Sequence, residues 1–224
     1  MITDFAAEIL RFFLLAFPAL FSIINPLGGA FVFLAVTRGA TAATRSRLAR
    51  RVALNSFVML LASMFIGGFV LRIFGISMPV LRVAGGVIIA LSAWTLLNAG
   101  DDTAERGAVV EEAGDRDLEH QAFYPLTMPM TTGPGTISVA IALGTGGRVE
   151  AHPLIFGLSA LVTACVVCLL IYLLYRSSSR IARAIGPTAT AIVARLSAFL
   201  LFCIGIQVLW TGVAELIAGL PVRS

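Results

Sequence analysis

Asn25-Pro26-Leu27-Gly28-Gly29 interrupts the first long apolar segment of this chain, and Thr132-Gly133-Pro134-Gly135-Thr136 interrupts another in its second half. A helix interior disfavours both residue types, because Pro lacks the amide proton and clashes with the preceding turn, while Gly costs backbone entropy. Inside a bilayer no water is present to bond the freed backbone groups. Paired interruptions at matching places in two halves therefore indicate a transport site built from broken helices.

The composition of the chain is that of a polytopic membrane protein. Hydrophobic residues make up 58% of it and charged residues 12%, with a mean hydropathy of +0.96, whereas soluble proteins carry about 25% charged residues. The formal net charge of +4 does not indicate nucleic-acid binding, because the arginines lie in short loops between apolar segments. We therefore expect most of the chain to contact other helices and the lipid bilayer.

Six stretches without Asp, Glu or Arg are long enough to cross a membrane as helices. A crossing needs about 20 residues, and these stretches contain 18 to 28. They span residues 12–37, 52–71, 83–100, 120–147, 151–175 and 196–214. The sequence therefore predicts an all-α membrane protein with six transmembrane helices.

The six stretches form two groups of three with the same order of lengths, longest first and shortest last. Pro18 precedes Pro26 by eight residues, and Pro125 precedes Pro134 by nine. Such agreement in order is typical of an internal repeat. Because three crossings are an odd number, the second repeat enters the membrane from the opposite side. This inverted arrangement brings the broken first and fourth helices together near mid-membrane.

We expect a first three-helix repeat at 1–100, an acidic linker at 101–121 and a second three-helix repeat at 122–224. The linker region carries eight of the 12 acidic residues, and this high charge predicts a flexible cytoplasmic segment. With both termini outside, 11 of the 16 arginines face the cytoplasm, as the positive-inside rule requires. Both termini should then face the periplasm or exterior.

The interruptions carry the candidate binding site. An unwound helix leaves amide protons at the start of one half-helix, which attract a carboxylate, and carbonyl groups at the end of the other, which attract an ammonium group or cation. A zwitterionic amino acid offers both groups, so a small neutral solute of this kind fits. Glycines let it approach the backbone, and uncharged polar side chains can bond it. The candidate substrate-binding residues are Ser22, Asn25, Pro26, Gly28, Gly29, Thr131, Thr132, Gly133, Pro134, Gly135, Thr136 and Gln207.

Alternatives apply to several of these residues. Gly, Ser and Thr are also favoured where membrane helices pack closely, so single members of the set can be structural. Gln207, like Asn55 in the second stretch, can bond unwound backbone instead of a solute. The first and fourth stretches can also form re-entrant hairpins instead of broken crossings.

The sequence indicates neither enzyme chemistry nor a cofactor. No catalytic, metal-binding or nucleotide-binding motif occurs, and Cys165-Val166-Val167-Cys168 has no basic neighbour that would activate a thiolate. No Asp or Glu lies inside a predicted crossing, which argues against a buried carboxylate proton relay. Coupling to Na⁺ held by carbonyls and hydroxyls, coupling to H⁺ by another route, and uncoupled flux all fit the residues.

Three motifs resemble the MarC family of integral membrane proteins. They are Phe21-Ser22-Ile23-Ile24-Asn25-Pro26-Leu27-Gly28-Gly29, Tyr124-Pro125-Leu126-Thr127-Met128-Pro129 before Gly133-Pro134-Gly135-Thr136-Ile137, and Arg82-Val83-Ala84-Gly85-Gly86. The likeness covers nearly the whole chain. It implies a bacterial or archaeal inner-membrane protein, grouped with transporters of small neutral amino acids such as glycine and alanine.

The leading functional hypothesis is therefore a secondary transporter or exporter of small neutral amino acids. It would work by alternating access at a midplane site between the two broken helices. The alternatives are a non-transporting membrane module that assembles or regulates a partner, and an exporter of another small solute. Assembly into a homo-oligomer is compatible with each of them.

Overall fold

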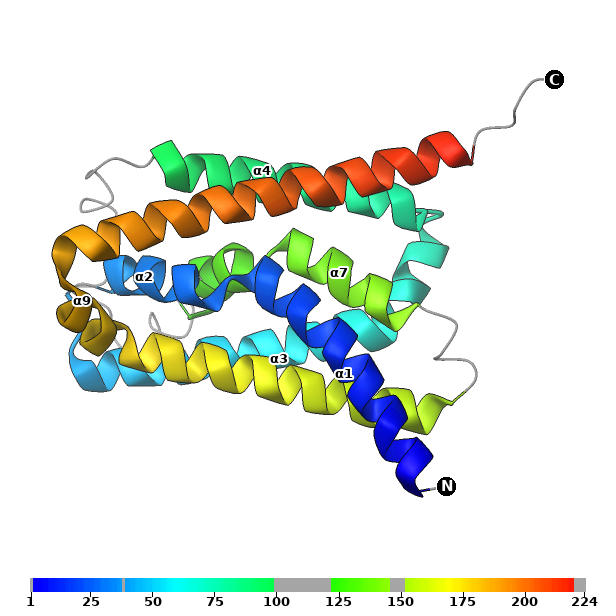
Figure 1. Ribbon diagram of the computed structural model, residues 1–224, viewed down its shortest axis with the longest axis horizontal. Coiled ribbons are helices and arrows are strands. Elements are labelled where there is room, and N and C mark those ends of the chain that lie inside the picture. Colours follow the sequence, from blue (N-terminus) through cyan, green and yellow to red (C-terminus); the bar gives the residue numbers. More distant parts are fainter. Residues whose placement is uncertain (1, 38, 99–121, 146–151, 220–224) are drawn as a thin grey trace.

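The chain folds into a bundle of long helices, which a computed structural model describes over residues 2–37, 39–98, 122–145 and 152–219 (Figure 1). These residues contain no β-strand. The predicted linker at 101–121 lies outside the described residues. The helices are α1 (Ile2–Ile24), α2 (Pro26–Val36), α3 (Ala42–Ile73), α4 (Met78–Asn98), η2 (Ala122–Thr131), α7 (Pro134–Gly144) and α9 (Pro153–Ala218).

Helix α9 makes two passes joined at a bend. Its 66 residues would extend about 100 Å if straight, roughly three times the thickness of a hydrocarbon core. Gly186, with φ 80° and ψ 167°, adopts a conformation that is open essentially only to glycine. The chain turns back at this residue. We call Pro153–Gly186 the first segment of α9 and Thr188–Ala218 the second segment.

The helices form three layers (Figure 1). Helix α4 and the second segment of α9 run side by side along one face, and α3 and the first segment of α9 lie along the opposite face. The half-helices α2 and α7 lie between them, where α7 contacts both α3 and α4, and α2 contacts α9. Helix α1 runs from the N-terminus towards the middle of the molecule, and α2 continues beyond it. The break between α1 and α2 therefore lies inside the bundle.

Five helices in the described chain are long and apolar enough to cross a membrane. The first of them, Phe5–Leu34, includes α1 and α2 across their break. The expectation of an all-α membrane protein is confirmed. In the fourth predicted stretch, 120–147, the described residues form η2 before the predicted break and the short helix α7 after it. The count of six crossings and their inverted repeat remain predictions.

The outer surface of the bundle is apolar, as expected for contact with lipid. Large side chains such as Leu14, Phe69 and Trp94 are more than half exposed, at 61%, 58% and 57%. The hydrophobic core lies between the layers and includes Leu20 and Leu60, both at 0% exposure. In water such a surface would be an aggregation hazard, so the distribution supports a lipid environment.

Glycines allow α4 and the second segment of α9 to pack backbone against backbone. A Cβ at Gly205 would lie 2.6 Å from the Ala90 backbone nitrogen, and a Cβ at Gly212 would lie 2.7 Å from the Pro79 carbonyl oxygen. Small residues at such crossings are typical of membrane helices, which gain stability from close van der Waals contact. These two helices consequently form a closely packed pair at one side of the breaks.

Candidate functional site at the two helix breaks

The first break is a single residue, Asn25, between α1 and α2. Its φ of 46° and ψ of 61° lie in the left-handed region, which Asn tolerates better than most residues. The side-chain oxygen accepts a hydrogen bond from the Gly28 amide at 3.2 Å and so caps α2, which begins at Pro26. The side-chain nitrogen donates to the Ser197 carbonyl oxygen at 3.1 Å. Both polar ends of Asn25 are therefore engaged within the protein.

The second break is longer than the sequence indicated, because it extends back through η2. Tyr124 (φ −123°, ψ 124°) and Met128 (φ −115°, ψ 122°) are extended, as is favoured for a residue that precedes proline. The peptide bonds Tyr124–Pro125 and Met128–Pro129 are cis. Two prolines thus keep the segment before α7 from forming a regular α-helix.

Threonine hydroxyls bond carbonyl groups in the wide turns of η2. Thr127 Oγ1 donates to the Ala122 carbonyl oxygen at 2.6 Å, and Thr131 Oγ1 donates to the Leu126 carbonyl oxygen at 2.7 Å. From α3, Asn55 Nδ2 donates to Thr127 Oγ1 at 3.4 Å. Asn55 therefore contacts the unwound segment through a side chain.

The start of α7 is less fully bonded than the start of α2. Gly133 precedes α7 and has no side chain to cap it, and Pro134 has no amide proton. The next amide protons, of Gly135 and Thr136, occupy positions that have no acceptor within a helix. Just before them, the Thr132 hydroxyl is buried and has no hydrogen-bond partner among the described residues. A helix N-terminus beside a free hydroxyl can bind an anionic group.

Tyr175 contacts residues that flank both breaks. It belongs to the first segment of α9 and is only 2% exposed. Its hydroxyl lies 2.9 Å from Thr131 Oγ1, and a Cβ at Gly29 would collide with the same hydroxyl. Its ring stacks on Phe33 of α2, with centroids 4.8 Å apart. The two breaks are therefore neighbours around a single buried side chain.

The half-helix after each break packs a glycine against a long helix from the other half of the chain. A Cβ at Gly28 of α2 would lie 2.5 Å from the Cβ of Ser197 in the second segment of α9. A Cβ at Gly135 of α7 would collide with Ile89 of α4 and lie 3.5 Å from the Gly85 carbonyl oxygen. Protein atoms thus occupy the space beside these glycines.

Most of the predicted site residues lie among these contacts, and two lie outside them. The Ser22 and Gln207 side chains are exposed, and Gln207 lines an outer groove with Trp210. The buried members of the set are Pro26, Gly28, Thr131, Thr132, Gly135 and Thr136, and the partly exposed members are Asn25, Gly29, Gly133 and Pro134.

Two residues at the breaks were not among the predicted site residues. Tyr175 stands next to Arg176 at the end of an uncharged stretch, a pattern typical of an interfacial anchor. Ser197 is one of many small polar residues, and its contact with Asn25 joins positions 172 residues apart. No local sequence signal reports such a contact, because only the fold brings the two positions together.

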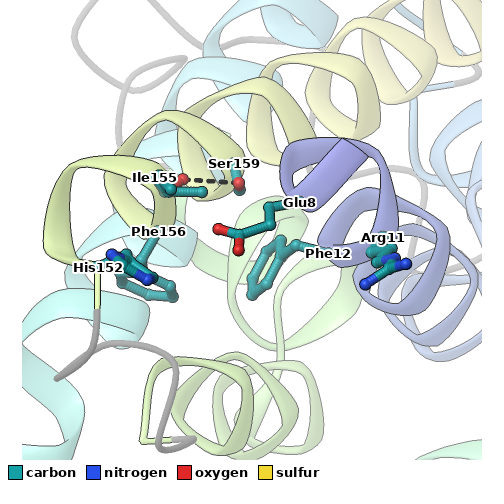
Figure 2. A pocket seen from close by; sticks show the side chains of 7 residues that line it. All are labelled: Glu8, Arg11, Phe12, His152, Ile155, Phe156 and Ser159. Carbon is teal, nitrogen blue, oxygen red and sulfur yellow. Dashed lines mark hydrogen bonds between the residues drawn. The ribbon is translucent and has the colours of Figure 1, made fainter. Parts of the chain in front are cut away.

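A separate pocket of about 140 Å³ lies between the N-terminal part of α1 and the start of α9. In Figure 2 the Glu8 carboxylate points into the space between these helices, and Arg11 lies on the other side of Phe12. The pocket is lined by Glu8, Arg11, Phe12, His152, Ile155, Phe156 and Ser159. None of these belongs to either break, so this charged pocket is distinct from the candidate site.

Both breaks and most of the helical residues lie within a region that matches a known family. The family model described as MarC family integral membrane protein covers residues 10–217. The chain belongs to the MarC family. The resemblance of its motifs is thereby confirmed, and the chain is an integral membrane protein.

Relatives within the MarC family come from bacteria and an archaeon. The inner membrane protein MarC of Escherichia coli is 33% identical over 211 residues, covering 88% of this chain and 92% of the relative. A membrane protein of Archaeoglobus fulgidus is 31% identical over 210 residues, covering 93% and 95%. The membrane protein YvbG of Bacillus subtilis is 30% identical over 198 residues, covering 88% and 91%. No solved structure matches the chain.

Proposed function

We propose that the protein is a secondary transporter or exporter of small neutral amino acids, of the size of glycine or alanine. One observation carries the proposal. Helix α7 begins two residues after Thr132 without a side-chain cap, and the buried Thr132 hydroxyl has no hydrogen-bond partner among the described residues. A carboxylate suits both groups, because a helix N-terminus attracts negative charge and a hydroxyl can donate a hydrogen bond. A neutral amino acid supplies a carboxylate without a net charge.

The first break can supply the complementary acceptor. Pro26 has no amide proton, so it cannot donate to the carbonyl of Ser22, four residues earlier in α1. A carbonyl released at the end of a half-helix favours an ammonium group. The proposed site therefore uses the backbone of α1 for the ammonium group and the start of α7 for the carboxylate.

The glycine contacts support two inverted repeats, at 1–100 and 122–224. Helix α2 of the first half packs Gly28 on the second segment of α9, while α7 of the second half packs Gly135 on α4. Helix α4 and the second segment of α9 are the third crossings of the two repeats. A two-fold axis in the membrane plane would make the half-helix of each repeat pack on the third helix of the other repeat. It would also place both breaks near mid-membrane.

Neighbouring side chains fill the space beside the break glycines, so a solute can enter only if helices move. The Tyr175 hydroxyl stands beside both Gly29 and Thr131, and it must shift before a solute can contact both breaks. Rocking of one repeat against the other supplies such a movement in transporters of this architecture. We therefore propose alternating access, with Na⁺ or H⁺ as candidate coupling ions.

The proposed location is the cytoplasmic membrane of a bacterium or archaeon. The relative from Escherichia coli is named an inner membrane protein. The arginine distribution favours both termini outside, because 11 of 16 arginines then face the cytoplasm.

Uptake into proteoliposomes tests the function directly. We expect purified protein to accumulate or exchange radiolabelled alanine and glycine above the level of protein-free liposomes, and zwitterionic competitors to inhibit this flux. Imposed Na⁺ and pH gradients applied separately identify the coupling ion. A panel of uncharged solutes without a carboxylate tests export of another small solute.

The alternative is a membrane module that assembles or regulates a partner. The filled space beside Gly28 and Gly135 favours this alternative, since close packing alone accounts for these glycines. Absence of both flux and binding across the solute panel, with protein that remains folded, would reject transport and leave this alternative.

A further inference from the structure

The outer face of the second segment of α9 carries a groove. Its volume is about 380 Å³. Only 12% of the most apolar stretch of this segment is buried, against 44% for the first segment. The groove is lined by Phe199, Phe202, Cys203, Ile206, Gln207 and Trp210. All of these are apolar or weakly polar except Gln207.

The Gln207 amide lies deep within the apolar part of the helix. It is 12 residues from Arg195 and eight from Glu215, which correspond to about 18 Å and about 12 Å along a helix. Both distances place it well inside a hydrocarbon core of about 30 Å. Lipid chains cannot bond an amide, and transfer of an unbonded amide into hydrocarbon is costly.

Gln207 differs from other polar side chains on the same two helices. Thr211 donates to the Gln207 carbonyl oxygen at 2.9 Å, and Thr95 of α4 donates to the Leu91 carbonyl oxygen at 3.0 Å. These hydroxyls are satisfied by their own helices. Within the described part of the chain, the side-chain amide of Gln207 has no such partner. The described helices therefore leave both the donor and the acceptor of this amide available to a further partner.

We propose that this groove is the interface between two copies of the chain, with the two Gln207 amides hydrogen-bonded to each other. A primary amide carries both a donor and an acceptor, so it is complementary to itself. Copies inserted in the same orientation pair about a two-fold axis along the membrane normal, and residues that face this axis meet their own counterparts. Amide side chains hydrogen-bond across membrane helices in this way.

The same geometry provides a natural probe of the interface. Cys203 is exposed and lies one helical turn from Gln207 on the same face. Near a two-fold axis, the Cys203 side chains of the two copies face each other. Trp210, 61% exposed, lies on the next turn and supplies apolar area to the contact.

Oxidative cross-linking in native membranes tests the interface. In a Cys165→Ser background, which removes the other exposed thiol, we expect copper-phenanthroline to give a disulfide-linked dimer through Cys203. The dimer should disappear in Cys203→Ser. A matched cysteine on another lipid-facing surface, Leu169→Cys combined with Cys203→Ser, should give little cross-linked product.

A second measurement tests the amide itself. Energy transfer between labelled copies, titrated over protein-to-lipid ratio, reports the dimer dissociation constant. We expect Gln207→Leu to weaken the dimer by about fivefold or more, while its thermal unfolding profile stays that of a folded helical protein. Monomeric protein at all ratios, equal cross-linking through Leu169→Cys, or unchanged dimerisation of Gln207→Leu would overturn the proposal. So would a folded monomer that retains a tightly bound lipid or another protein in the groove. Each outcome is independent of transport.

Discussion

At Thr132, stability and binding make opposite demands on one side chain. Its hydroxyl is fully buried and unbonded among the described residues, and leaving such a group without a partner costs about 1–3 kcal/mol. Thr163, equally buried, donates to the Ser159 carbonyl oxygen at 2.7 Å. An unsatisfied group in a native protein calls for an explanation, and the solute carboxylate proposed above would supply one.

Replacing Thr132 with valine should therefore separate stability from function. Thr132→Val keeps the side-chain shape and removes the unbonded hydroxyl, so we expect the free energy of unfolding to stay unchanged or rise by up to about 1 kcal/mol. Loss of a hydrogen bond to a carboxylate should raise the KM for alanine about tenfold. Denaturant unfolding in detergent and proteoliposome uptake measure the two effects.

The matched control is Thr163→Val, because the Thr163 hydroxyl is bonded within its own helix. Its uptake should equal that of the wild type. Unchanged uptake by Thr132→Val would remove this hydroxyl from the binding site, and a large loss of stability would show that it has a structural partner.

The contact between Gly29 and Tyr175 should behave as one unit. Gly29→Ala places a Cβ against the Tyr175 hydroxyl, and overpacking of this kind costs about 1–3 kcal/mol. Tyr175→Phe alone should also destabilise, since it removes the bond to Thr131. In the double variant the collision is absent. We therefore expect its loss of unfolding free energy to be smaller than the sum of the two single losses by about 1 kcal/mol. Denaturant unfolding of all four proteins measures this coupling.

Gly157→Ala serves as the control for Gly29→Ala, because among the described residues only its own helical turn lies within 4 Å of a Cβ at Gly157. It should be neutral or slightly stabilising, as Ala favours a helix over Gly. Strict additivity in the Gly29 and Tyr175 cycle would mean that Tyr175 does not pack between the breaks.

At the scale of elements, the start of α2 depends on Asn25 for two separate reasons. The residue holds a left-handed backbone conformation, and its side chain both caps α2 and bonds Ser197. Glycine keeps the first property and loses the second, whereas alanine loses both.

The two substitutions at Asn25 should therefore differ. We expect Asn25→Gly to lower the free energy of unfolding by about 1 kcal/mol through the lost side-chain bonds. Asn25→Ala should cost about 1–2 kcal/mol more, because its Cβ strains the left-handed conformation. Equal losses would indicate that the backbone at this position relaxes without the side chain.

The sequence predicted the position of each break and underestimated the length of the second. Asn25-Pro26 and Gly133-Pro134 are strong local signals, since Pro cannot donate in a helix. Pro125 and Pro129 were visible as well, but a proline alone does not decide whether the helix resumes after it. Threonine hydroxyls and Asn55 bond the carbonyls and side chains of η2, and these partners are set by packing.

At the scale of the whole molecule, an odd or even number of membrane crossings decides whether the two termini lie on opposite sides of the membrane or on the same side. Five helices qualify as spans by length and composition, and five crossings would place the termini on opposite sides. If η2 and α7 together form a sixth crossing, both termini lie on one side.

Reporter fusions distinguish these arrangements. We expect alkaline phosphatase fused to the C-terminus to be active and a C-terminal green fluorescent protein to be dark, since both report an exterior location. An N-terminal tag should be cleaved by protease added to spheroplasts. A fluorescent C-terminal fusion together with an accessible N-terminal tag would reject the six-crossing inverted repeat.

The sequence by itself determined the membrane class, the apolar helices and the two places where they break. These properties depend on composition, hydropathy and the local stereochemistry of Pro and Gly, which act within a few residues. Only the tertiary structure decided that Tyr175 contacts residues beside both breaks and that the Ser197 carbonyl accepts a hydrogen bond from Asn25. It also decided that the Gln207 side chain is exposed. Such contacts depend on the rotation and crossing of helices far apart in sequence. Many apolar faces satisfy the same hydropathy pattern, so packing alone selects among them.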